Sequence, residues 1–83
     1  MRAYFAAISH VDHEIGRFLR VLEASPLGDK TTVIFLSDNG FNLGNHDSFH
    51  KMSQWDSAAH VPLGIWSPRM SEGRVIDLPV SLH

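Results

Sequence analysis

Asp38, Asn39, His46 and Lys51 carry the side chains of this sequence that are best suited to chemistry. Asp38 and Asn39 directly follow an apolar run, and adjacent oxygen donors suit a hard divalent cation such as Ca²⁺ or Mg²⁺. Because the same two residues followed by Gly40 are also frequent turn formers, a simple turn is the alternative interpretation.

His46 and Lys51 lie in and just beyond the polar stretch that follows this pair, so both can return to it. The lysine can bind an anionic substrate oxygen while a cation holds another. The alternatives are a histidine that only fills the loop and a solvated lysine at a helix start. His10 and His13, one helical turn apart, are interpreted as ordinary histidines because no further ligand is near them in the sequence.

The elements that must position these residues follow from the apolar pattern. Residues 3–24 have apolar side chains at spacings of three and four, which predicts a helix lying on a sheet. The unbroken run over 32–36 predicts a strand covered on both faces. Helix, short loop and strand make half of a βαβ unit. In such sheets ligands bind beyond the carboxyl ends of the strands, where Asp38 and Asn39 are placed.

The second half of the chain predicts a loop over 41–50, a short helix over 51–59 and a further strand over 61–66. Pro62 and Gly64 make this an edge-type strand. Residues 74–80 are predicted to add a last extended segment. The fold class is therefore α/β, in the order long helix, buried strand, loop, short helix and further strand.

Composition excludes several classes of function. The chain has 83 residues, 43% hydrophobic and 19% charged, which is typical of one small globular domain. A net charge of −2 provides no basic surface for nucleic acid. No cysteine is present, and no apolar run approaches the roughly 20 residues that span a bilayer. The chain opens directly into a helical pattern and stops without a capping element, so we expect a fragment of a larger α/β protein.

Taken together, these stretches resemble the later part of the catalytic domain of the sulfatase family, within the alkaline-phosphatase-like superfamily. The matching stretches are 37–46 (SDNGFNLGNH), Lys51 and 55–63 (WDSAAHVPL), with similar helix and tail segments over 9–17 and 73–81. The HVPL ending over 60–63 looks most like the iduronate-2-sulfatase branch. The resemblance implies that residues 1–83 are a partial catalytic domain from an alkaline-phosphatase-like sandwich.

By position, the resemblance implies that Asp38 and Asn39 ligate the active-site cation, usually Ca²⁺, with Mg²⁺ as the alternative. It implies that Lys51 contacts the sulfate group and that His46 lines the substrate pocket. The partner is then a sulfated small molecule or glycan, hydrolysed by a formylglycine nucleophile expected upstream of this chain.

The chain also departs from the family pattern. It lacks the C/S-x-P-x-R motif that yields formylglycine, since the spacing of Ser67-Pro68-Arg69 is wrong, and it lacks the first pair of aspartate ligands. Asn45 and Asp47 replace the commoner glutamate and glycine. We therefore expect the 83 residues alone to be inactive.

Two other functions remain open from the sequence. A phosphonate or phosphodiester hydrolase of the same superfamily would share the metal half-site. A non-catalytic remnant would keep the scaffold as a binding module. The nucleophile motif upstream separates the first from a sulfatase, and calcium-dependent stabilisation bears on the second.

Overall fold

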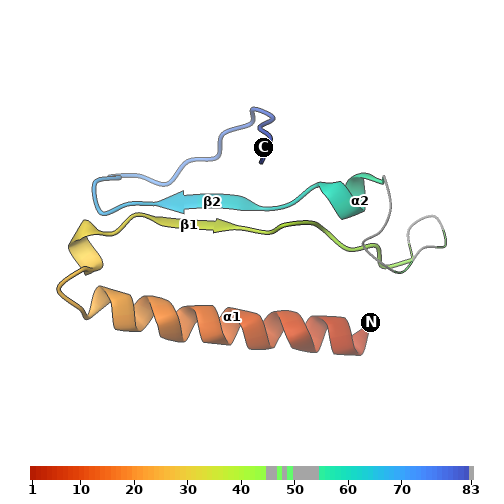
Figure 1. The fold of residues 1–83 in the computed structure, drawn as a ribbon, viewed down its shortest axis with the longest axis horizontal. Helices are drawn as coiled ribbons and strands as arrows, with labels where there is room; N and C mark the ends of the chain where they lie inside the picture. Colours follow the sequence, from red (N-terminus) through yellow and green to blue (C-terminus); the bar gives the residue numbers. More distant parts are fainter. Residues whose placement is uncertain (45–46, 48, 50–54, 83) are drawn as a thin grey trace.

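The computed structural model describes residues 1–44, 47, 49 and 55–82. A long helix runs beside a two-stranded sheet, and the segment after the second strand has no regular element (Figure 1). The elements are α1 (Arg2–Glu23), the 3-10 turn η1 (Gly28–Lys30), β1 (Val33–Leu36), α2 (Asp56–Ala59) and β2 (Leu63–Trp66).

The turn between α1 and β1 is built by a serine and a glycine. The Ser25 hydroxyl donates a 2.7 Å hydrogen bond to the Leu22 carbonyl oxygen and accepts a 3.2 Å bond from the Leu27 amide. Gly28 is buried, and a Cβ there would lie 2.7 Å from the Leu22 carbonyl oxygen. The helix therefore ends where the sequence predicts, because only glycine fits so close to the last helical turn.

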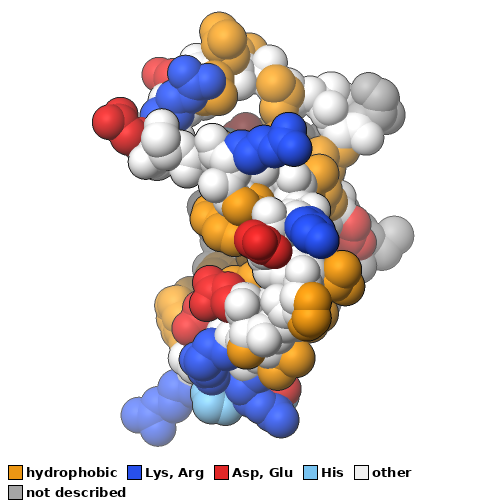
Figure 2. All heavy atoms as spheres, turned by 90° about the vertical axis from the view of Figure 1, so that its left-hand side faces the viewer, with side chains coloured by type: hydrophobic (Ala, Val, Ile, Leu, Met, Phe, Trp, Pro, Cys, Tyr) orange, Lys and Arg blue, Asp and Glu red, His pale blue; other side chains and the backbone are white. Residues whose placement is uncertain are grey.

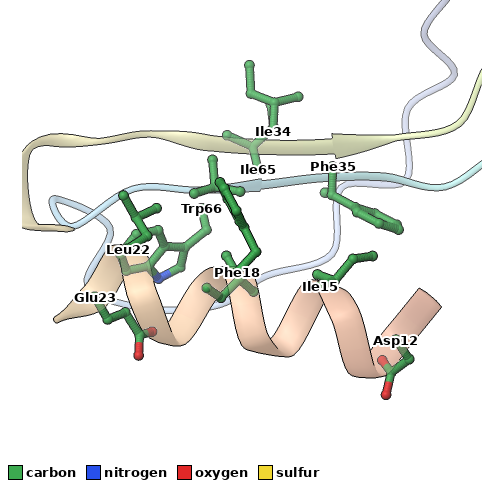
Figure 3. A pocket seen from close by; sticks show the side chains of 12 residues that line it. Asp12, Ile15, Phe18, Leu22, Glu23, Ile34, Phe35, Ile65 and Trp66 are labelled. Atoms are coloured by element: carbon green, nitrogen blue, oxygen red, sulfur yellow. The ribbon is translucent and has the colours of Figure 1, made fainter. Parts of the chain in front are cut away.

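β1 and β2 pair antiparallel, with Val33 opposite Trp66 and Leu36 opposite Leu63. This pairing joins β1 to the strand that follows it, so it does not test the predicted half of a βαβ unit, which consists of α1 and β1. Opposite residues of an antiparallel pair share a face of the sheet. Figure 3 shows Phe35 and Trp66 directed toward α1, and Ile34 directed away from it. The other face is formed by aliphatic side chains from both strands: Ile34, Leu36, Leu63 and Ile65.

The predicted burial of the first strand is wrong for this structure. Ile34, Phe35 and Leu36 are 58%, 48% and 49% exposed. Among the described residues only α1 lies along one face, and a space of about 620 Å³ separates it from the strands (Figure 3). The run over 32–36 has the composition of a strand that is buried on both faces. Among the described elements, however, only α1 lies along the sheet, and it lies on one face (Figure 3).

Other expectations are met in part. The second strand forms, beginning after Pro62, and the short helix is present as α2, with residues 51–54 outside the described part. The segment over 74–80 does not form a strand, and Val75 within it is 95% exposed. No sheet edge lies against this segment to supply backbone hydrogen bonds in the described residues.

The surface mixes charge and apolar area. On the face shown in Figure 2, acidic and basic side chains alternate with hydrophobic ones, and no large field of one sign forms there. Within the described residues, no helix combines the length and hydrophobicity that crossing a bilayer requires.

Candidate functional site

Asp38 and Asn39 follow β1 at its carboxyl end, at the position that the sequence predicts. The Asn39 amide donates a 3.0 Å hydrogen bond to Asp38 Oδ1, and the Ser37 hydroxyl donates a 2.8 Å bond to the Asn39 carbonyl oxygen. These bonds fix the backbone of the turn. Asp38 is exposed, and its Oδ2 has no hydrogen-bond or ion-pair partner among residues 1–44 and 55–82. With respect to these residues, one carboxylate oxygen is open to a ligand.

The turn is attached to α2 immediately beyond this pair. The Gly40 amide donates a 2.7 Å hydrogen bond to the Ala58 carbonyl oxygen. A Cβ on Gly40 would collide with the Ser57 carbonyl oxygen and lie 3.3 Å from the Ala58 carbonyl carbon. Glycine is required here by the close approach of the two backbones.

A second attachment is made by side chains. The Ser57 hydroxyl donates a hydrogen bond to Asn42 Oδ1, and Asn42 is fully buried. Ala58, which is 3% exposed, is the apolar residue most deeply buried in the described part of the chain. Two of the three buried residues in the described part of the chain, Asn42 and Ala58, thus lie at the junction between α2 and the loop that carries Asp38 and Asn39.

A groove of about 650 Å³ runs between the first half of α1 and this junction. The rings of Tyr4 and Phe41 lie 5.4 Å apart at its wall, and Ala7, Ile8 and Val11 extend its apolar side. Its polar lining includes the carboxylate residue Asp12 from α1 together with Ser37, Asn39, Ser57 and His60. Asn39 therefore lines a concave surface, and the adjacent Asp38 is exposed next to it.

The histidines divide into three groups. His10 and His13 are exposed on α1, which agrees with their interpretation as ordinary histidines. His60 Nδ1 lies 3.6 Å from Asp56 Oδ2, one turn away along α2, and both side chains are largely exposed. His46, His50 and His83 lie outside the described residues.

Lys51 also lies outside the described residues, so its approach to Asp38 stays a prediction. No group of three or more histidines and carboxylates gathers in the described part of the chain. Asp38 and Asn39 together offer oxygen donors of the type that calcium prefers, but calcium takes six to eight oxygens. The pair fits one side of a cation site, with further ligands coming from elsewhere.

Sequence reasoning did not identify Asn42 and Ser57. Asparagine and serine are common in polar loops and short helices, so their presence there does not indicate a functional role. A hydrogen bond between positions 15 residues apart also leaves no pattern in the local sequence. Gly40 was noted only as a turn former. Its close approach to α2 could have been inferred from a glycine next to a candidate ligand.

Comparison with known proteins identifies one family. The family model described as Sulfatase matches residues 1–83. A sulfatase of Formosa agariphila is 39% identical over 82 residues, covering 99% of this chain and 16% of that protein. Human iduronate 2-sulfatase is 40% identical over 78 residues, covering 94% of this chain and 14% of that protein.

An arylsulfatase of Clostridium perfringens is 37% identical over 85 residues, covering 98% of this chain and 18% of that protein. The chain thus spans less than one fifth of the length of these relatives. No solved structure matches it significantly.

Proposed function

Because this chain belongs to the sulfatase family, we propose that it supplies one half of a divalent-cation site and a sulfate-contacting lysine to a sulfuric ester hydrolase. Residues 1–83 would then be part of a sulfatase catalytic domain of the alkaline-phosphatase-like sandwich type. The observation that carries the proposal is the exposed Asp38 carboxylate just beyond β1, whose Oδ2 has no partner among residues 1–44 and 55–82 and whose Oδ1 accepts the Asn39 amide.

Each residue has a separate role in this proposal. Asp38 Oδ2 and the Asn39 side-chain oxygen would hold the cation, Ca²⁺ first and Mg²⁺ as the alternative. When bound, the cation offsets negative charge on the oxygens of the sulfate ester. Lys51 would bind another sulfate oxygen, and His46 would line the substrate pocket.

The names of the relatives favour sulfate over phosphate as the group transferred. A choline-sulfatase of Rhizobium meliloti is 38% identical over 72 residues. Its name, like those of the arylsulfatase and the iduronate 2-sulfatase, specifies a sulfate ester. The substrate class proposed is therefore a sulfated small molecule or glycan. The nucleophile, a formylglycine, would come from residues outside this chain, since the 83 residues contain no cysteine and no S-x-P-x-R motif.

The cation half-site is tested by titrating the 83-residue chain with calcium chloride and following its backbone amides by NMR. We expect the chemical shifts of the Asp38 and Asn39 amides to change with calcium concentration. The fitted Kd should be in the millimolar range, which is typical of weak calcium sites. At ten times Kd, binding should raise the free energy of unfolding by about 1.4 kcal/mol. A parallel titration with magnesium chloride compares the two cations.

Asp38→Asn removes the carboxylate but keeps the shape of the side chain. We expect it to weaken calcium binding roughly tenfold, equivalent to about 1.4 kcal/mol. Asp77→Asn, at an exposed position of the tail, is the matched control and should bind as the parent chain does. Equal calcium shifts in the parent and Asp38→Asn chains would show that the cation binds elsewhere.

A further inference from the structure

The loop that carries the cation pair is fastened to α2 by two hydrogen bonds of different kinds. One joins the backbones of Gly40 and Ala58 at 2.7 Å, and the other joins the side chains of Ser57 and Asn42. On the loop side, the bonds involve Gly40 and Asn42, which are two and four residues after Asp38 in the sequence. Gly40 directly follows Asn39. The turn is therefore connected directly to α2.

The burial of this junction contrasts with the exposure of the strand that precedes it. Asn42 is 0% exposed and Ala58 is 3% exposed, whereas Leu36 at the end of β1 is 49% exposed. A buried hydrogen bond in a dense contact holds its partners in one arrangement, because breaking it leaves polar atoms without water. The position of Asp38 and Asn39 is thus set by α2 as well as by β1.

We infer that Ser57 and Asn42 are positioning residues for the cation pair, acting through Gly40 and Asn39. This inference rests on the proposed function for its calcium readout, but it also makes a claim about the loop without calcium. Neither residue offers a ligand atom that is open, because the Ser57 hydroxyl is engaged with the buried Asn42. Their effect on the cation is therefore indirect.

The experiment compares Ser57→Ala, which removes the donor, with Ser57→Thr, which keeps a hydroxyl at the same position. Ser71→Ala, an exposed serine of the tail, is the control. Hydrogen exchange is measured at the amides of Gly40 and Ile34 in each 83-residue chain. The calcium Kd of each chain is then measured from the Asp38 amide shift.

We expect Ser57→Ala to raise the exchange rate at Gly40 roughly fivefold, the effect of losing one ordinary hydrogen bond. Exchange at Ile34 in β1 should be unchanged, and the calcium Kd should rise by a similar factor. Ser57→Thr should restore both values, and Ser71→Ala should alter neither.

The results separate this inference from the proposed function. If the parent chain shows no calcium shift, the proposed cation site is wrong, and exchange at Gly40 alone decides the positioning role. Unchanged Gly40 exchange in Ser57→Ala overturns that role. An equal rise at Ile34 overturns it as well, because the loss would then be a general loosening of the fold.

Discussion

The Gly40 amide donates a 2.7 Å hydrogen bond to the carbonyl oxygen of Ala58, across the long connection between β1 and β2. The bond brings the segment leaving the first strand against the short helix that leads into the second. It is the backbone element of the junction that holds Asp38 and Asn39.

Gly40→Ala should lower the free energy of unfolding by about 1–3 kcal/mol, since its Cβ would collide with the Ser57 carbonyl oxygen. Gly73→Ala is the control, because a Cβ at Gly73 meets nothing within 4 Å. That change should stay within about 0.5 kcal/mol. Urea unfolding followed by tryptophan fluorescence measures both. Equal effects at the two glycines would contradict the close packing of Gly40 on α2.

Replacing Ile34 and Ile65 together by threonine should reduce self-association with little loss of stability. Both side chains are more than half exposed on the face of the sheet away from α1, and threonine keeps the β-branched shape. We expect the free energy of unfolding to change by less than about 1 kcal/mol. Sedimentation velocity measures the association.

The comparison variant is Phe35→Thr on the face toward α1 (Figure 3). Since Phe35 is about half exposed, we expect this change to cost about 1–2 kcal/mol. If it is tolerated as well as the Ile34 and Ile65 pair, α1 does not cover this face in solution.

Arg17→Ala should have almost no effect on stability, although Arg17 Nη1 lies 2.9 Å from Glu14 Oε2. Both side chains are well exposed, so water and salt screen the pair. We expect a loss of about 0.2–0.5 kcal/mol that disappears in 1 M salt, where the screening length is about 3 Å. A double-mutant cycle with Glu14→Gln measures the coupling, and a coupling above 1 kcal/mol would be inconsistent with this exposure.

The 83-residue chain should not hydrolyse nitrophenyl sulfate faster than buffer without protein does, whether or not calcium is present. It contains no cysteine, and no S-x-P-x-R motif from which formylglycine could be made. The assay follows the coloured nitrophenol product. Turnover that survives purification would mean that another residue of this chain attacks the ester, and it would require a different mechanism.

The sequence predicted the helix and both strands well because each depends on local patterning. The predicted helix over 3–24 is α1 over Arg2–Glu23, and the two apolar runs contain β1 and β2. The Ser25–Gly28 turn follows from residue types that act over a few positions. The resemblance to sulfatases, drawn from motifs over 37–63, agrees with the family match over the whole chain.

Burial and the site were harder to predict, for different reasons. An apolar composition indicates that a strand can be buried on both faces. It does not indicate whether other elements pack on those faces, so the sequence did not predict the exposure of Ile34 and Leu36. The Asn42–Ser57 bond joins two distant positions and has no local pattern. The sequence placed Asp38 and Asn39 correctly at the strand end, while the approach of His46 and Lys51 to them stays a prediction.

The antiparallel register has a consequence for how such a chain can vary. Leu36 and Leu63 are opposite each other, so the polypeptide leaves and re-enters the sheet at the same end. The entropic cost of closing the loop between the two strands grows only slowly with the length of the loop. The strand pairing therefore places little constraint on the number of residues in the connection beyond Asn42, so relatives can differ in length there without losing the sheet.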